Sequence, residues 1–347
     1  MFKHLLSLSL YVCAGLFFTL NAQEPDGYYV DAEGSKKDVL KTRLSSIVNS
    51  EAQIISYKGL WTAYKTTDVR EDGKLFDIYS TCSFTMVTTQ CGNYKNVCDC
   101  YNREHTVPQS WFNEASPMVS DIIHVLPTDG RVNSQRSNYP YGECASGTTL
   151  RNGRGKLGKC TYPKSYSNTV FEPDDEFKGD IARIYFYMAT RYESKVGSWS
   201  GDAFGNGKYP GLKAWQVELM LKWHRQDPVS DREIKRNNGV YSVQKNRNPF
   251  VDHPELAEHV WGTKMNEIWN LPLSLEKVSD LKIYASSNSV RIEGVSSNIS
   301  YKIYNIAGSV IKQGFSEEDC SISLPRSGIY IVSVQTNNNL INKKISL

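Results

Sequence analysis

Three stretches of the chain repeat apolar residues at the spacing of an amphipathic helix. They cover residues 36–50, 175–193 and 212–226, and the first of them carries Val39, Leu40, Leu44 and Ile47. Between the first stretch and the second, residues 74–107 have the pattern of short strands and turns. Helical and strand patterns do not alternate as in repeated βαβ units, so this part of the chain predicts a mixed α+β fold.

The pattern changes at about Leu273, where short β-rich runs begin. They include Ser289–Glu293, Tyr301–Asn305 and Ile329–Val334, and we expect turns at Gly294, Gly308, Gly314 and Gly328. Short strands separated by turns at this spacing predict a small all-β sandwich. The region contains no cluster of catalytic residue types.

The N-terminus carries an apolar run from Leu5 to Leu20, preceded by Lys3 and His4. This run is shorter than the roughly 20 residues that a membrane-spanning helix needs. With its basic start and the small Ala22 at its end, it predicts a signal peptide at residues 1–22. No other segment is long and apolar enough to span a membrane. We therefore expect an exported protein, secreted or at the cell surface, with no stable membrane span.

Export changes how the cysteines are interpreted, because disulfides form in oxidising compartments. The formal net charge of +3 is too small to indicate a partner. The spacing of the cysteines in the middle of the chain matches no zinc motif, so disulfides of open connectivity are expected there. These cysteines are Cys82, Cys91, Cys98, Cys100, Cys144 and Cys160. Cys320 stands apart and is expected to be unpaired.

Residues near the C-terminus resemble the sorting domain of the type IX secretion system. The resemblance rests on the turn Tyr304–Gly308, the strand Gly328–Val332 and the basic pair Lys343 and Lys344. It implies that residues 273–347 form a sorting domain that is recognised by the secretion machinery. The alternative is an accessory β-domain that binds carbohydrate or stabilises the chain.

Reactive residue types are densest between Tyr101 and Glu143, where Glu104 and His105 are adjacent and Asn133 follows. Hydrolysis of a phosphodiester needs a base that works near neutral pH, which suits a histidine. It also needs a cation to neutralise the phosphate and the departing oxygen. A hard cation such as Mg²⁺ takes carboxylate and amide oxygens as ligands. A Glu-His pair alone is weak evidence, because such a histidine is more often structural.

Several blocks of sequence, in order, resemble the endonuclease I family of the ββα-metal (His-Me finger) superfamily. They are Asn102–His105, Asp121 with His124, Gly130–Asn133, Arg136–Tyr139, Phe171–Pro173, Lys178–Arg183, Asn246–Phe250 and Asp252–Pro254. The likeness covers about residues 26–265. It implies a ββα-metal finger core within a largely helical nuclease domain at residues 23–272, followed by the all-β sandwich.

The resemblance also implies a role for each of the three central residues. His105 would be the general base that activates water, and Glu104 and Asn133 would be the metal ligands. The expected metal is Mg²⁺, with Mn²⁺ or Ca²⁺ as alternatives, and the expected products carry 5′-phosphate ends. One departure is Ile123, where many relatives carry a histidine.

Five further residues are weaker candidates for contacts with the substrate or the metal ligands. Arg103 is one of them, and Arg136 is favoured as a phosphate ligand. Asp121 and Asn138 either support the ligands or make turns and helix caps, and His124 either orients a ligand or only packs. Away from this cluster, we expect His253 to close a loop by hydrogen bonds, and His224 and His259 to lie at the surface.

Basic residues are concentrated around Asn133. Between Arg131 and Asn168 there are seven basic residues against Glu143 alone, a balance of +6 (7 − 1), and they include the glycine-rich loop Arg151–Lys156. Such a flank suits the phosphate backbone of DNA and RNA, although a merely solvated loop is the alternative. Backbone contacts without base readout predict low sequence specificity.

The sequence therefore predicts a monomeric, secreted, metal-dependent endonuclease. A catalytically silent surface protein that binds nucleic acid is a second hypothesis, and the intact set of Glu104, His105 and Asn133 argues against it. A disulfide-rich hydrolase of a different phosphoester is a third, and the extended basic flank argues against that one.

Overall fold

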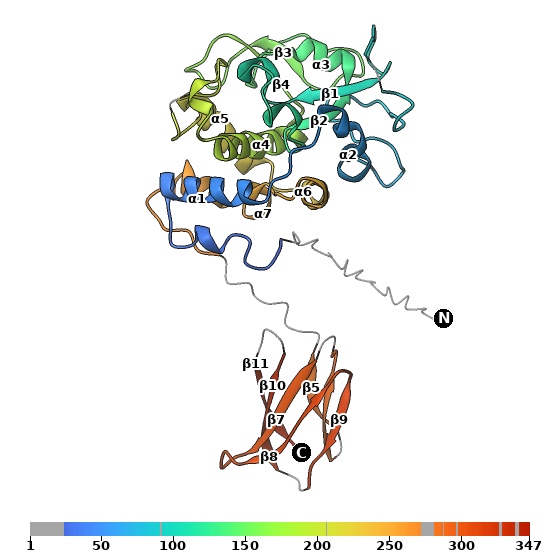
Figure 1. The fold of residues 1–347 in the computed structure, drawn as a ribbon, viewed down its shortest axis with the longest axis vertical. Coiled ribbons are helices and arrows are strands. Elements are labelled where there is room, and N and C mark those ends of the chain that lie inside the picture. Colours follow the sequence, from blue (N-terminus) through green and yellow to red (C-terminus); the bar gives the residue numbers. More distant parts are fainter. Residues whose placement is uncertain are drawn as a thin grey trace, which may run out of the picture. The chain divides into compact units, whose positions relative to one another are not determined.

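The computed structural model describes residues 24–90, 92–205, 207–271, 281–286, 288–295, 298–325, 328–336 and 340–347. The predicted signal peptide at residues 1–22 and Cys91 lie outside these ranges. Contacts between Cα atoms divide the chain into two compact units, Met1–Asn270 and Leu271–Leu347. The helices lie in the first unit, and the second is built from strands (Figure 1).

The first unit is mainly helical. Its α-helices are α1 (Lys37–Ser50), α2 (Leu60–Thr67), α3 (Gly130–Arg136), α4 (Lys178–Arg191), α5 (Ala214–Gln226), α6 (Asp231–Gln244), α7 (Pro249–Asp252) and α8 (Leu256–Val260). The predicted helices are found as α1, α4 and α5, with ends that differ from the prediction by at most three residues. Among the described residues, no helix is long and apolar enough to cross a bilayer.

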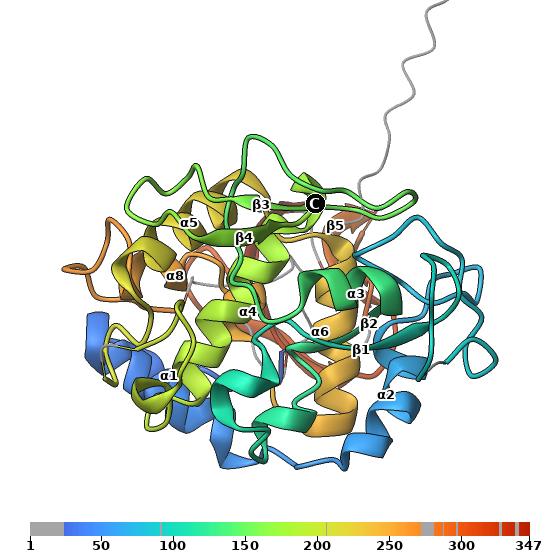
Figure 2. The ribbon, with the colours of Figure 1, turned by 90° about the horizontal axis from the view of Figure 1, so that it is seen from above.

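The helix α4 forms the centre of this unit, and every one of its residues is buried. It packs against α1 and α5, and Figure 2 shows it among the other helices. The sequence predicted a helix with one apolar side, whereas its polar residues are buried as well. They are accommodated by ion pairs such as that of Arg183 with Glu233, whose Nε and Oε1 atoms lie 2.5 Å apart, because a buried charge requires a partner.

A ββα unit lies beside this helical core, as the resemblance implied. Strand β1 (Tyr101–His105) pairs in antiparallel register with β2 (Val125–Asp129), so that His105 lies opposite Val125. Helix α3 follows β2 directly, because the Asp129 side chain caps it by accepting hydrogen bonds from the backbone N–H groups of Arg131 and Val132. The short hairpin β3 (Lys156–Lys159) and β4 (Thr169–Glu172) follows α3.

The second unit contains two antiparallel sheets. Their orders are β11-β10-β7-β8 and β5-β6-β9, formed by β5 (Lys282–Ser286), β6 (Ser289–Glu293), β7 (Ile299–Asn305), β8 (Val310–Ser316), β9 (Cys320–Ser323), β10 (Ile329–Gln335) and β11 (Leu340–Ser346). Side chains from both sheets share one core, which confirms the predicted sandwich. The expected turn at Gly314 is wrong: Gly314 lies within β8 opposite Tyr301, whose ring occupies the space that a Cβ atom would need.

The cysteines only partly follow the prediction. Cys82 and Cys98 form a disulfide with Cα atoms 5.3 Å apart, and Cys100 is also disulfide-bonded. Cys144 and Cys160 are free thiols, so the expectation that they form disulfides is wrong. They are buried in a small apolar cluster with Val170, which accommodates a thiol as a small hydrophobic group. Cys320 is free, as predicted.

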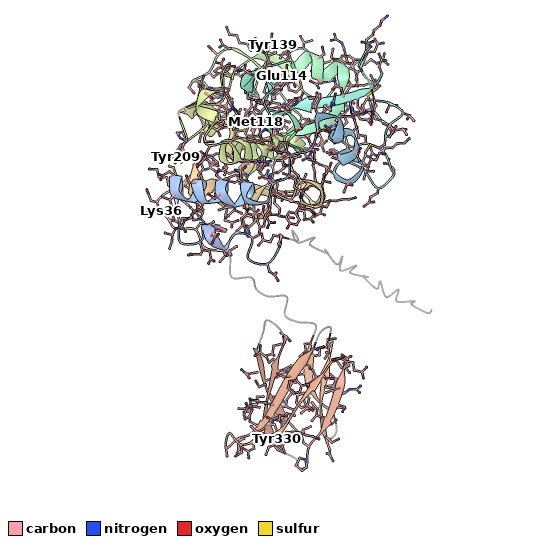
Figure 3. All side chains as sticks on the ribbon, viewed as in Figure 1. Lys36, Glu114, Met118, Tyr139, Tyr209 and Tyr330 are labelled. Carbon is pink, nitrogen blue, oxygen red and sulfur yellow. A yellow bond between two sulfur atoms is a disulfide. The ribbon has the colours of Figure 1, made fainter. Side chains whose placement is uncertain are left out.

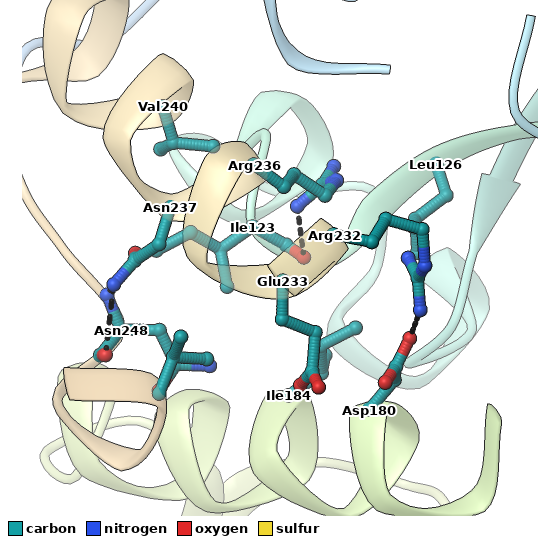
Figure 4. A pocket seen from close by; sticks show the side chains of 11 residues that line it. Ile123, Leu126, Asp180, Ile184, Arg232, Glu233, Arg236, Asn237, Val240 and Asn248 are labelled. Atoms are coloured by element: carbon teal, nitrogen blue, oxygen red, sulfur yellow. Dashed lines mark hydrogen bonds and ion pairs between the residues drawn. The ribbon is translucent and has the colours of Figure 1, made fainter. Parts of the chain in front are cut away.

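A small buried pocket between α4, α6 and β2 is lined by an ion-pair network rather than by reactive groups (Figure 4). Arg232 pairs with Asp180, and the Arg236 guanidinium donates to the carbonyl oxygen of Ile123 at 3.2 Å. Ile123, the position singled out in the sequence as a departure from the family pattern, therefore faces this interior pocket.

Three histidines outside the ββα unit are held by hydrogen bonds inside the fold. His224 and His259 were expected at the surface, but they are 9% and 7% exposed. Their rings bond to the carbonyl oxygens of Pro254 and Glu267 respectively, which lets both be buried. His253 closes a loop as expected, because its Nε2 lies 2.8 Å from Glu24 and its Nδ1 lies 3.6 Å from Glu255.

We expect Glu24→Gln to remove part of a pH-dependent stabilisation. Although burial acts in the opposite direction, hydrogen bonds to Glu24 and Glu255 raise the pKa of His253 to about 9. The resulting stabilisation, at most about 3 kcal/mol, is complete below pH 6.5 and is lost as the pH rises through about 9. Thermal melting across this range should show a smaller pH dependence for Glu24→Gln than for the wild type or for Asp26→Asn. Identical profiles for all three would contradict the assignment.

Candidate active site

A polar pocket of about 510 Å³ lies at the end of β1. Six of the eight residues that the sequence singled out line it: Arg103, Glu104, His105, Asn133, Arg136 and Asn138. Asp121 and His124 do not line it and lie deeper in the fold. The ββα unit explains the grouping, because β1 carries the first three residues and α3 carries Asn133 and Arg136 against it.

The His105 ring is held in one orientation by the backbone. Its Nε2 lies 3.0 Å from the carbonyl oxygen of Val119, which accepts a hydrogen bond, so Nε2 carries the proton. In the neutral ring, Nδ1 then keeps its lone pair. Burial and the neighbouring His124 lower the pKa of His105 to about 3, so the ring is neutral at neutral pH. The neutral ring is the form that accepts a proton, and its lowered pKa makes it a weaker base than an exposed histidine.

Glu104 is 1% exposed, and its carboxylate is held in place through the oxygen Oε1. Its Oε1 lies 3.1 Å from Arg136 Nη1 and accepts a hydrogen bond of 2.9 Å from the Tyr79 hydroxyl. Burial raises the pKa of Glu104, and Arg136 and Tyr79 act in the opposite direction. Among the described residues, the ion pair and the Tyr79 hydrogen bond both fall on Oε1, and Tyr141 is a further hydrogen-bond partner of the carboxylate. No ion pair falls on Oε2, which is the oxygen that can take a further ligand.

Asn133 is oriented so that its amide nitrogen faces the protein. Nδ2 donates to Asn102 Oδ1 at 2.7 Å and to the carbonyl oxygen of Arg103 at 3.3 Å. Within the described part of the chain, Oδ1 has no hydrogen-bond donor, which leaves an amide oxygen beside the carboxylate of Glu104 in the same pocket.

This pair of oxygens fits a hard, largely hydrated cation. Mg²⁺ keeps several water ligands and takes one or two carboxylates together with phosphate oxygens from a substrate. The described residues contain no group of three or more His, Cys, Asp and Glu that could enclose a metal. The donor set therefore suits an open site for Mg²⁺ better than a closed structural site for zinc.

The sequence favoured Arg136 as a phosphate ligand. Arg136 does line the pocket, but its charge is already paired within the protein. Its guanidinium is 1% exposed and donates to the carbonyl oxygens of His105, at 2.8 Å, and Thr106, at 2.5 Å. With the ion pair to Glu104, these bonds occupy both terminal nitrogens. The contacts tie α3 to the end of β1 and hold the Glu104 carboxylate in place.

Asp121 and His124 support the wall behind His105. The Asp121 carboxylate accepts hydrogen bonds from Arg191 at 2.8 Å and from the hydroxyls of Tyr187 and Tyr192 at 3.0 and 2.7 Å. The His124 ring packs 5.6 Å from that of His105 and bonds through Nε2 to the carbonyl oxygen of Met118. The 3₁₀-helix Met118–Ser120, which contains Val119, is thus fixed from behind.

Several tyrosines complete the site and were not predicted. The Tyr57 ring stacks against that of His105, with centroids 5.9 Å apart and planes 26° apart, and the Arg103 guanidinium lies 3.6 Å from the Tyr57 centroid. Tyr79 bonds to Glu104 and to the Tyr141 hydroxyl. Tyr57 precedes His105 by 48 residues, and with 21 tyrosines in the chain nothing in the sequence singled these out.

The basic flank is less free than its sequence indicated. Arg154 pairs with Glu176, and Lys156 pairs with Glu172 at 3.1 Å, so the acidic segment 172–176 neutralises part of it. Of the seven basic residues of this flank, all within the described ranges, four form no ion pair and are at least partly exposed: Arg131, Arg151, Lys159 and Lys164. These four remain available to a polyanion.

Comparisons with known proteins identify the family to which this chain belongs. The Endonuclease I family model matches residues 37–255, and the model of the secretion system C-terminal sorting domain matches residues 283–347. An extracellular ribonuclease of Bacillus subtilis is 37% identical over 69% of this chain and 79% of its own length. An endonuclease-1 of Buchnera aphidicola is 31% identical over 38% of this chain and 46% of its own length. An extracellular deoxyribonuclease of Aeromonas hydrophila is 29% identical over 40% of this chain and 52% of its own length.

The family model and these relatives show that the protein is a nuclease, an enzyme that hydrolyses nucleic acid. The chain belongs to the endonuclease I family, whose nucleases generally depend on a divalent metal. It carries a C-terminal sorting domain and is secreted or carried to the cell surface.

Proposed function

We propose that this enzyme hydrolyses phosphodiester bonds in both DNA and RNA, as a monomer, with Mg²⁺ and with little sequence specificity. His105 is the general base, and Glu104 and Asn133 are the metal ligands. The observation that carries the proposal is the shared pocket, in which the neutral His105 ring lies beside two oxygen donors that retain unused lone pairs.

The proton transfer follows from the orientation of His105. Because Nε2 is committed to the Val119 carbonyl, Nδ1 takes a proton from water as the water oxygen attacks the phosphorus. The bond from phosphorus to the 3′-oxygen breaks, and that oxygen acquires a proton from solvent. The products are a 5′-phosphate and a 3′-hydroxyl. No side chain forms a bond to the substrate.

Glu104 Oε2 and Asn133 Oδ1 would hold the cation at this pocket. When bound, Mg²⁺ supplies charge that stabilises the phosphate and the departing oxygen. The protein keeps both oxygen donors in place: Arg136 and Tyr79 hold the carboxylate, and Asn102 holds the amide. Outer contacts of this kind orient metal ligands and maintain their affinity. We therefore assign Arg136 to the positioning of Glu104.

The proposed substrate range rests on two observations. Relatives named as a ribonuclease and as a deoxyribonuclease both match the nuclease domain of this chain. The unpaired basic side chains Arg131, Arg151, Lys159 and Lys164 supply backbone contacts, which do not distinguish one base from another.

We expect Glu104→Gln and Asn133→Ala to raise the Mg²⁺ concentration that gives half-maximal activity. Loss of a direct oxygen ligand should have at least the effect of losing an outer contact, which costs about 10–100-fold in metal affinity. The measurement is the rate of plasmid nicking against Mg²⁺ concentration, with detection of 5′-phosphate ends by end labelling. Glu114→Gln is the matched control, since Glu114 lines the same pocket and is exposed. A normal metal response in either ligand variant would overturn its assignment.

A further inference from the structure

A second polar pocket, of about 580 Å³, continues the active-site pocket along the same two chain segments. Gln109 and Ser110 line the first pocket, and the next residue, Trp111, lines the second. Asn138 lines both pockets. The chain reaches the second pocket directly after α3, because Ser137 has a left-handed backbone (φ 54°) that turns it away from the helix axis.

Among its described lining residues, the second pocket combines an aromatic surface, neutral polar groups and one cation without an ion-pair partner. Tyr139 is 38% exposed and lies at the outer surface of its unit (Figure 3). The Tyr166 ring is stacked on Trp215, with centroids 4.0 Å apart and planes 9° apart, and its hydroxyl donates to Asp202 at 2.8 Å. Lys159 is exposed and, among the described residues, has no acidic partner.

Other groups in this pocket favour hydrogen bonds to a ligand with several polar atoms. Asn168 and Ser167 are exposed and contribute an amide and a hydroxyl to the lining. The acidic Asp202 is compensated, because Lys213 Nζ lies 3.6 Å from its Oδ1 and Tyr166 bonds to its Oδ2. Lys159 is therefore left to attract an anion, and the tyrosines present faces on which a planar ring can stack.

We infer that this second pocket binds one unpaired nucleotide of a single-stranded substrate, next to the bond that is cut. The base stacks on an aromatic ring, Lys159 contacts its phosphate, and the amides contact its polar edges. This combination of stacking and backbone charge is how single strands are bound without strong sequence preference. The inference rests on the proposed nuclease function and adds a substrate class to it: strands whose bases are free to enter a pocket.

A duplex would not use this pocket in the same way. A paired base must leave its stack before it enters a pocket, which costs a few kcal/mol, whereas an unpaired base pays little. The stacking surface of the second pocket should therefore raise the rate on single strands and leave cutting of duplex DNA unchanged.

The test uses the mature enzyme and single-stranded oligonucleotides that lengthen by one nucleotide at a time on either side of the cleaved bond. In the wild type, kcat/KM should rise by about tenfold at one step, the value of one stacked base. Tyr139→Ala should lose this rise, Tyr139→Phe should keep it, and both should nick duplex plasmid at the wild-type rate. Lys159→Ala should also reduce the length step, and it should lower the salt dependence of single-strand binding in EDTA by about one ion.

The controls distinguish a failure of the second-pocket proposal from a failure of the proposed nuclease function. Lys164→Ala removes an exposed lysine of the same flank that does not line the pocket, so it should keep the length step. An enzyme that cuts none of the oligonucleotides would contradict the proposed function itself. Normal cleavage with the same length step in Tyr139→Ala and Lys159→Ala would overturn the second pocket alone. Lys159→Ala changes only a surface side chain, so the test still decides if Tyr139→Ala fails to fold.

Discussion

Replacement of His105 by alanine is expected to reduce cleavage of DNA and RNA by about 10²–10⁴-fold, the usual contribution of a general base. The Nδ1 atom of this ring is the only proton acceptor that we assign to the attacking water, and Nε2 is tied to Val119. Binding of nucleic acid should be retained, because the unpaired basic residues lie on other segments. Single-turnover cleavage and binding in EDTA measure the two effects separately.

The matched control is His253→Gln, which removes a histidine that contacts Glu24 and Glu255 far along the chain from the pocket. This variant should cut at the wild-type rate at a temperature where it is folded. Full activity of His105→Ala would contradict the assignment of the base. Loss of binding together with activity would instead mean that His105 acts by holding the pocket in shape.

The second large effect is expected on stability, in Asp121→Asn. The Asp121 carboxylate is 2% exposed and compensates the buried cation of Arg191. Removal of one partner of a buried ion pair leaves the other uncompensated, so the free energy of unfolding should fall by about 3–5 kcal/mol. Denaturant unfolding at neutral pH measures the loss, and Asp72→Asn, at an exposed pair with Arg70, should cost less than about 1 kcal/mol. Equal stability of both variants would contradict the stabilising role that we give to the pair of Asp121 and Arg191.

The pH dependence of this effect has a definite sign. Burial alone would raise the pKa of Asp121, but Arg191, His124 and several hydrogen bonds hold it below its usual value. The stabilisation is therefore present above the ordinary pKa of an aspartate and is lost as the pH falls through the lower folded pKa. The difference between wild type and Asp121→Asn should shrink at acid pH.

Asp121 also links stability to catalysis. Its segment runs into the 3₁₀-helix Met118–Ser120, and the Val119 carbonyl in that helix fixes His105. A displaced Val119 would free the ring to turn, so Asp121→Asn should lower kcat even where it remains folded. The motif in the sequence placed Asp121 near the active site. In the structure, Asp121 lies behind the 3₁₀-helix Met118–Ser120 that holds His105.

The sequence predicted those parts of the fold that have a strong local signal. The helix α1 carries apolar residues at regular spacing, and β6 was predicted with the bounds that the structure shows. The helix α6 was missed because its sequence is mostly polar, and its start depends on a capping box between Ser230 and Glu233. Burial of both faces of α4 could not be predicted, because it depends on partners distant in the chain.

The same distinction holds for the site. Glu104, His105 and Asn133 were proposed from the sequence because they belong to ordered motifs, and all three line one pocket. The contacts that orient them come from elsewhere: Tyr79 is 25 residues before Glu104, and the Val119 carbonyl has no side-chain signature. Arg136 was predicted to contact phosphate because its charge is visible in the sequence, whereas its burial beside Glu104 is not.

The measurement that tests the central claim most directly is digestion of plasmid DNA and of RNA by the mature protein, with Mg²⁺ and with EDTA in excess. We predict cleavage of both substrates with Mg²⁺, 5′-phosphate ends on the products, and no cleavage in EDTA until Mg²⁺ is restored. Cleavage that continues unchanged in EDTA would contradict the metal-dependent mechanism.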